Sequence, residues 1–126
     1  MQKEIIYTEN APAPIGPYSQ GVKAGGFLFL SGQIALDAKT GELLNADIAT
    51  ETHQVMKNII ALLNAANTTT ANIVKTTIFL SDMGLFAAVN EVYASYFGID
   101  APARETVAVK GLPKNVNVEI SVTAFL

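Results

Sequence analysis

The sequence predicts an α+β domain in which two helices pack on one face of a mixed β-sheet. Two segments, Asp47 to Ala66 and Met83 to Phe97, place apolar residues at the helical period. The runs before, between and after them are short and rich in β-branched and aromatic residues. The order is strand, hairpin, helix, strand, helix, strand, strand, which is typical of two strand–helix units sharing one sheet. At 126 residues we expect a single domain, residues 1–126.

The N-terminal part begins with a short strand and a stiff loop. Residues 3–7 have the composition of a strand, and residues 10–17 contain three prolines and a glycine, which exclude both a helix and a central strand. The loop leads to Tyr18, which has an apolar ring and a polar hydroxyl. Two interpretations of Tyr18 stay open, the lip of a pocket and an ordinary loop residue with a packed ring.

A β-hairpin is predicted over residues 22–31. Gly25 and Gly26 separate its two strands and suit a two-residue turn with positive φ. Gly32 follows the second strand and indicates either a bulge or a place where another group approaches the backbone closely. Residues 37–41 form a further turn, with glycine at its left-handed position.

The first helix is expected to begin after Asp47, a candidate N-cap, and to end near Ala66. Asn67 is suited to end it in the left-handed conformation. Its apolar stripe consists of Ile48, Thr52, Val55, Met56, Ile59, Leu62, Leu63 and Ala66. His53, the only histidine, lies beside this stripe, and we interpret it as a flank residue with a local hydrogen bond instead of a catalytic base.

A strand over residues 73–80 precedes the second helix. Asp82 is its candidate cap, and Gly98 ends it after Phe97. The buried stripe consists of Leu85, Phe86, Val89, Val92, Tyr93, Tyr96 and Phe97. Asn90 lies on the shoulder of this stripe, where a polar residue is usually solvated.

The last quarter of the chain contains its two most unusual charges. Arg104 is the only arginine, and its planar fork binds carboxylates through two parallel hydrogen bonds; a surface residue at the start of a strand is the alternative. From Val116 to Phe125 apolar residues alternate with others, and Glu119 is the one charge in that strand. A carboxylate on a covered sheet face needs a partner, a raised pKa or a function.

Composition limits the functional classes. Hydrophobic residues make up 50% of the chain and charged residues only 15%, so we expect part of the surface to be buried between copies of the chain. There is no cysteine and a single histidine, which argues against a thiolate nucleophile and a metal site. The net charge of −3 is a poor match for nucleic acid. No signal-peptide pattern or membrane-length apolar run occurs, so we expect a cytoplasmic protein.

The remaining residues point to one kind of chemistry. The sequence has no phosphate-binding loop, dinucleotide fingerprint or serine-hydrolase elbow. An arginine, a glutamate on a sheet face, a tyrosine and hydroxyls near strand ends suit a small carboxylic acid that is held by its carboxylate and attacked by water, which a glutamate of raised pKa would activate.

Five motifs follow one another along almost the whole chain. They are Ile15-Gly-Pro-Tyr-Ser-Gln-Gly21, Phe29-Leu-Ser-Gly-Gln33, Val74-Lys-Thr-Thr-Ile-Phe-Leu-Ser-Asp-Met83, residues 86–97 with Val-Asn-Glu-Val-Tyr, and Pro102-Ala-Arg with Leu112-Pro and Val118-Glu-Ile120. Each is weak alone, but their order and spacing are specific. With them the chain resembles the RidA/YjgF family of enamine/imine deaminases.

The resemblance implies a chorismate-mutase-like fold, a homotrimer, and ligand sites in clefts between subunits. Members of the family hydrolyse 2-imino or enamine acids, such as 2-aminoacrylate, 2-iminopropanoate and 2-iminobutanoate, to 2-oxo acids and ammonia without a cofactor. We therefore expect small 2-imino and 2-oxo carboxylic acids as partners. The family's catalytic arginine, glutamate, tyrosine and serine, and its ligand-lining glycine and asparagine, correspond to Arg104, Glu119, Tyr18, Ser31, Gly32 and Asn90.

The chain departs from the family pattern beside Arg104. Thr106, which we include among the substrate-binding residues, stands where many members have cysteine. Glu105 stands where a small serine is common, and it either competes for the Arg104 guanidinium or points to the other face of the strand. The alternative function is a non-catalytic regulator of amino-acid or purine metabolism that senses 2-oxo or imino acids in the intersubunit cleft. Ribonuclease activity is disfavoured by the charge.

Overall fold

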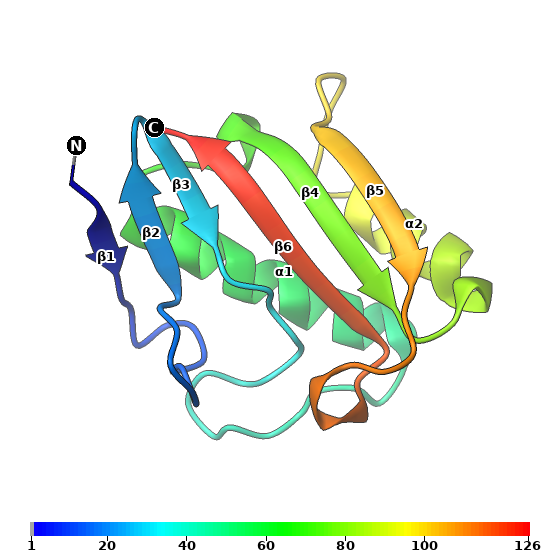
Figure 1. The fold of residues 1–126 in the computed structure, drawn as a ribbon. Coiled ribbons are helices and arrows are strands. Elements are labelled where there is room, and N and C mark those ends of the chain that lie inside the picture. Colours follow the sequence, from blue (N-terminus) through cyan, green and yellow to red (C-terminus); the bar gives the residue numbers. More distant parts are fainter. Residues whose placement is uncertain (1) are drawn as a thin grey trace.

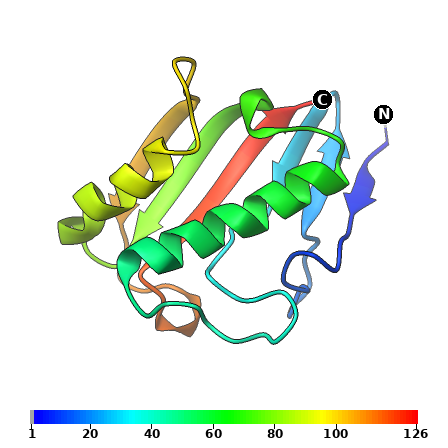
Figure 2. The same ribbon diagram turned by 180° about the vertical axis from the view of Figure 1, so that it is seen from behind.

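A computed structural model describes residues 2–126 as a six-stranded mixed sheet with two α-helices on one face, as Figure 1 and Figure 2 show from opposite sides. The strands are β1 (Glu4–Ile6), β2 (Gly21–Ala24), β3 (Phe27–Leu30), β4 (Ile73–Leu80), β5 (Ala103–Ala108) and β6 (Val118–Phe125). Their order in the sheet is β1-β2-β3-β6-β4-β5, with only β4 and β5 parallel. The helices are α1 (Ile48–Ala65) and α2 (Phe86–Ala94). The predicted fold class and element order are confirmed.

The core lies between the helices and the sheet because one side of each central strand is apolar. On β6 the alternate residues Val118, Ile120, Val122 and Ala124 are buried in the same cluster as the apolar stripe of α1. This alternation was predicted, and it places Glu119 on the opposite side. We call that side, which carries no helix, the open face of the sheet (Figure 1).

Several local predictions are confirmed by backbone geometry. Gly25 and Gly26, in the β2–β3 turn, have φ of 59° and 84°. The Asp47 carboxylate accepts a hydrogen bond from the Thr50 N–H at 2.7 Å, so Asp47 is the N-cap of α1. Asn67 follows the helix with φ of 61°. The side-chain choices at these turns therefore agree with the backbone they adopt.

The second helix is shorter than predicted from its apolar stripe. Met83–Leu85 form a separate 3₁₀ turn, in which Gly84 N–H donates to the Asp82 carboxylate at 2.6 Å. The α-helix ends at Ala94, where the Ser95 hydroxyl donates to the carbonyl of Val92 at 2.6 Å and competes for the helical acceptor. Apolar periodicity continues through such tighter turns, so it does not locate the ends. Among residues 2–126, no helix combines the length and hydropathy needed to cross a membrane.

The open face carries exposed apolar side chains. Five of them are 42–51% exposed, namely Ile5, Phe27, Phe29, Val107 and Phe125. Two of these side chains are cross-strand neighbours, since Phe27 of β3 is paired with Phe125 of β6. An apolar sheet face of this kind suits burial against another protein surface.

Candidate active site

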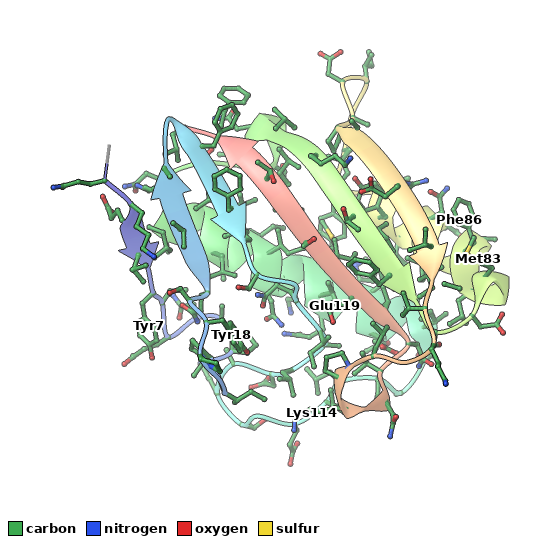
Figure 3. The ribbon with its side chains drawn as sticks, in the orientation of Figure 1. Tyr7, Tyr18, Met83, Phe86, Lys114 and Glu119 are labelled. Atoms are coloured by element: carbon green, nitrogen blue, oxygen red, sulfur yellow. The ribbon has the colours of Figure 1, made fainter. Side chains whose placement is uncertain are left out.

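A cavity of about 390 Å³ opens where the chain leaves β3. β3 pairs with β6 as far as Phe29, and the chain returns to β6 at Gln33, whose N–H and carbonyl bond to Ile120 at 2.8 and 3.0 Å. Between these points the Ser31–Gly32 segment lines the cavity, together with Tyr18 and Glu119. Figure 3 shows the side chains of Tyr18 and Glu119, which come from separate segments of the chain. Four of the predicted site residues therefore share one cavity.

Glu119 projects from β6 into this cavity. Its carboxyl is partly buried, and burial raises its pKa above the usual value near 4.5. The side chain lies against the backbone of Gly32: a Cβ built on Gly32 would overlap Oε2 and would lie 2.9 Å from Cδ. The close approach predicted at Gly32 is thus made by the chain's own glutamate.

Tyr18 is held at the cavity by an ordered loop. The Tyr18 ring is 49% exposed, and its hydroxyl accepts a hydrogen bond from the N–H of Ile15 at 3.4 Å. Gln20 is buried, and its amide donates to the carbonyls of Thr8 and Pro12 at 3.0 and 2.9 Å. Of the two interpretations of Tyr18, the structure agrees with the lip of a pocket. Sequence reasoning missed Gln20 as the residue that orders this loop.

The hydroxyl of Ser31 donates a hydrogen bond within the chain. Its hydroxyl donates to the carbonyl of Ser19 at 2.6 Å, and its N–H donates to the carbonyl of Gln20 at 3.0 Å. The hydroxyl proton is therefore engaged, and the oxygen lone pairs remain able to accept a hydrogen bond.

Arg104 lies on the other side of the sheet, against α2. Its Nη1 donates to Asn90 Oδ1 at 2.7 Å, and its guanidinium carbon is 5.6 and 5.1 Å from the ring centroids of Phe86 and Tyr93. These contacts orient the guanidinium group and use one of its five N–H donors. Asn90 is thus a hydrogen-bond partner of Arg104, and the interpretation of it as an ordinary solvated residue is wrong.

A second cavity, of about 480 Å³, adjoins this arginine. Arg104 and Asn90 line it together with Gly98, Ala101 and Pro102 of the connection before β5. Thr106 is two residues beyond Arg104 on β5 and so faces the same side, but it does not line this cavity. Its Oγ1 is buried and has no hydrogen-bond partner within residues 2–126. A hydroxyl buried in this way is suited to a ligand atom or a water.

Glu105 points to the open face and does not compete for Arg104. Its carboxylate pairs with Lys75 Nζ at 2.8 Å and accepts a hydrogen bond from the Thr77 hydroxyl. These two side chains, Lys75 foremost, hold the pKa of Glu105 below its usual value. Of the two alternatives for Glu105, the other face of the strand is confirmed and competition is wrong.

The predicted residues fall into two groups that do not meet within one chain. Arg104 faces α2, whereas Glu119 faces away from the helices because its neighbours Val118 and Ile120 are both in the core. We call the Tyr18, Ser31, Gly32 and Glu119 group the carboxylate half-site, and the Asn90, Arg104 and Thr106 group the arginine half-site. The two groups therefore lie on opposite sides of the sheet of one chain.

Two residues outside the predicted set support the structure elsewhere. His53 Nδ1 lies 2.7 Å from the Tyr96 hydroxyl, so His53 is hydrogen-bonded as expected, but to the segment after α2 and not locally. Glu51, which the sequence marks only as a first-turn acid of α1, is fully buried. Its carboxylate accepts from the N–H groups of Asn117 and Val118 at 2.8 and 3.2 Å, and so fixes the start of β6 beside Glu119.

Comparison with known proteins agrees with this fold. The family model described as Endoribonuclease L-PSP matches residues 8–126. A RutC family protein of Pyrococcus horikoshii is 54% identical over 123 residues, with 98% of each chain covered. An Arabidopsis thaliana protein named Reactive Intermediate Deaminase A, chloroplastic, is 44% identical over 126 residues, which cover all of this chain and 67% of that protein.

Two solved structures are similar over nearly their full lengths. YyfA of Yersinia pestis, a protein of the conserved Rid family, has a TM-score of 0.96 at 49% identity, with 99% of this chain and 100% of that chain covered. E. coli TdcF, solved with bound serine, has a TM-score of 0.93 at 40% identity, with 98% of each chain covered. These similarities define a protein with the fold of the Rid proteins. The chain belongs to the RidA/YjgF family, as its motifs predicted.

Proposed function

We propose that two copies of this chain form a site that hydrolyses 2-imino acids and their enamine tautomers to 2-oxo acids and ammonia. The substrates are small carboxylic acids such as 2-aminoacrylate, 2-iminopropanoate and 2-iminobutanoate. The observation that carries the proposal is the Glu119 carboxyl, which lies in a cavity beside Gly32 with a pKa raised by burial alone. A carboxyl in that setting is suited to general acid–base chemistry near neutral pH. The similarity to Reactive Intermediate Deaminase A supports this reaction class.

The complete site joins the arginine half-site of one copy to the carboxylate half-site of the next, in a homotrimer. β5 is an edge strand of the sheet, so the cavity at Arg104 lies where a neighbouring copy can approach. The exposed apolar residues of the open face, among them Phe27, Phe29 and Phe125, supply surface for such an interface. The opposite facing of Arg104 and Glu119 supports a site that is completed only on assembly.

In this site Arg104 binds the substrate carboxylate through its planar fork. Glu119 accepts a proton from water while the water oxygen forms a bond to the imine carbon, and then gives that proton to the imine nitrogen. In the resulting carbinolamine the hydroxyl proton passes through Glu119 to the amino group, the C–N bond breaks to release ammonia, and the hydroxyl oxygen becomes the carbonyl of the 2-oxo acid. Positioning and proton transfer by one carboxyl group suffice for this reaction, because imines are already reactive toward water. No cofactor takes part.

Other polar groups of the half-sites orient the substrate. The Ser31 hydroxyl oxygen accepts a hydrogen bond from the substrate nitrogen, because the hydroxyl already donates its own proton to the carbonyl of Ser19. The Thr106 hydroxyl, buried without a partner among the described residues, donates to the substrate carboxylate beside Arg104. Threonine thus replaces the cysteine common in the family without removing a hydrogen-bonding atom from that position.

A second candidate is a regulator that binds 2-oxo or imino acids without turnover. The serine bound in the TdcF structure favours it, because that relative holds an amino acid in a solved structure. Such a role requires Arg104 but not Glu119. A ribonuclease role, which the name of the family model suggests, has little support from a chain with net charge −3 and one arginine.

A coupled assay separates these candidates. A dehydratase generates 2-aminoacrylate or 2-iminobutanoate in situ, and its decay is followed with wild type, Arg104→Lys and Glu119→Gln. The deaminase proposal predicts acceleration by wild type and a loss of about 100-fold or more in both variants. If wild type is inert but binds 2-oxo acids through Arg104, the regulator is supported. Full activity of Arg104→Lys would exclude the bidentate carboxylate clamp.

A further inference from the structure

The cavity that contains Glu119 is larger than a small imino acid requires. Its volume of about 390 Å³ falls in the range of roughly 300–1,000 Å³ that accommodates drug-sized ligands. The side chain of 2-iminopropanoate is a single methyl group. Beyond Glu119 the cavity wall includes the apolar side chains of Pro12, Ile15 and Leu36. Within one chain the cavity therefore offers an apolar wall for a longer substrate side chain beside the polar groups around Glu119.

Lys114 lies on the rim of the same cavity, in the turn that precedes β6 (Figure 3). The ion pair found among residues 2–126 joins Lys75 to Glu105, so the Lys114 ammonium is not engaged by a carboxylate of the described chain. No ion pair of the described residues joins Lys114 to Glu119, and burial raises the pKa of the Glu119 carboxyl. One cavity thus holds a carboxyl at Glu119 and a separate ammonium at its rim.

The backbone at Lys114 is strained. Lys114 has φ of 54° and ψ of 23°, and Asn115 has φ of 56°. Asparagine adopts the left-handed region readily, but lysine does so at a cost because its Cβ crowds the backbone. Asparagine or glycine would serve the turn better than lysine does. Strained residues of this kind cluster at sites that bind ligands.

We propose that Lys114 binds an anionic group at the end of the substrate side chain, so that the site accepts the 2-imino dicarboxylates related to acidic amino acids. The inference rests on the proposed function above. Arg104 of one copy holds the 2-carboxylate, and Glu119 of the next copy acts at the imine carbon. The methylene groups of the side chain pack on Pro12 and Leu36, and the second carboxylate pairs with Lys114.

The test compares an anionic substrate with a neutral one of similar size. Amino-acid oxidases generate the imines of glutamate and leucine in situ, and kcat/KM is measured for wild type, Lys114→Gln and Lys110→Gln. Lys110 is a matched control, because it is an exposed lysine of the same connection that does not line the cavity. Wild type is expected to prefer the glutamate imine. Lys114→Gln should lower the glutamate-to-leucine ratio of kcat/KM about tenfold, and Lys110→Gln should leave it unchanged. An unchanged ratio in Lys114→Gln, or a wild-type preference for the leucine imine, overturns the proposal.

Binding of the stable products keeps this inference separate from catalysis. Calorimetric titration with 2-oxoglutarate and with 4-methyl-2-oxopentanoate needs no turnover. We expect Lys114→Gln to weaken 2-oxoglutarate binding about tenfold relative to the neutral 2-oxo acid. If no imine is hydrolysed but this difference is found, the deaminase fails and the role of Lys114 stands. Equal binding of the two acids in both proteins overturns the role of Lys114 while leaving the deaminase untouched.

Discussion

Replacing Gly32 by Ala places one methyl group where the Glu119 side chain now lies. The new Cβ would overlap Oε2 and would approach Cδ and Cγ to 2.9 and 3.1 Å, all closer than ordinary van der Waals contact. Because these atoms belong to the flexible end of a side chain, the carboxylate rotates away while the fold is kept. Gly32→Ala thus moves the proposed base without changing its chemistry.

The magnitude follows from the size of that movement. Clearing the overlap displaces the carboxylate by about 1 Å, and a misplacement of this size costs about 100-fold in rate. Holding Glu119 in a less favourable rotamer costs about 1 kcal/mol of folding free energy. We therefore expect kcat/KM for 2-iminobutanoate to fall about 100-fold while the free energy of unfolding, measured with denaturant, falls by about 1 kcal/mol or less.

Gly111→Ala is the matched control for this variant. A Cβ built on Gly111 meets nothing within 4 Å, so the change adds the same methyl group to an open position of the same chain. It should leave both kcat/KM and stability near the wild-type values. If Gly32→Ala retains full activity, or if both glycine variants lose activity equally, the reasoning that Glu119 acts from its position against Gly32 is refuted.

Three further predictions concern stability. Burial raises the pKa of Glu119, so the folded chain keeps a proton that the unfolded chain loses as pH rises above about 4.5, and this group then lowers the free energy of unfolding. Denaturant titrations should therefore show Glu119→Gln to be more stable than wild type at neutral pH. The difference in stability should disappear in acid, where Glu119 is protonated in both states. Asparagine adopts positive φ more readily than lysine, so Lys114→Asn should raise the free energy of unfolding by about 0.5–1 kcal/mol. A lower free energy of unfolding in this variant would show that the backbone at residue 114 is not strained by lysine. Glu51→Ala removes the acceptor of buried N–H groups at the start of β6 and should destabilise the chain by about 3 kcal/mol; a change within experimental error would contradict the role of Glu51 in fixing that strand.

The elements of the fold were predictable because their determinants are local. Alternation from Val116 onward predicts the buried and open faces of β6, and two adjacent glycines predict the β2–β3 turn. Asp47 and Asn67 mark the two ends of α1 by capping chemistry. The second helix was predicted too long, because apolar periodicity persists through the 3₁₀ turn before Phe86 and the tightened end after Ala94.

The arrangement of the site depends on contacts that the sequence does not display. Arg104 and Glu119 both stood out as isolated charges, yet only the three-dimensional pairing of β4, β5 and β6 shows that they face opposite sides of the sheet. Glu51 resembles any first-turn acid, and its burial depends on Asn117, which is far away in the chain. Lys114 follows a turn-like Leu-Pro pair, but its left-handed φ has no signature in the lysine itself.

The central claim is that an active site contains the arginine half-site of one copy and the carboxylate half-site of another. Mixing Arg104→Ala with Glu119→Gln tests it most directly, because each variant lacks a different half. After co-expression or joint refolding, about a quarter of the interfaces in a randomly mixed ring combine the two unaltered halves, so about a quarter of wild-type deaminase activity should return. Mixing Glu119→Gln with Gly32→Ala, two changes in the same half, should restore nothing. If the first mixture is as inactive as its components although mixed oligomers have formed, a site shared between copies is contradicted.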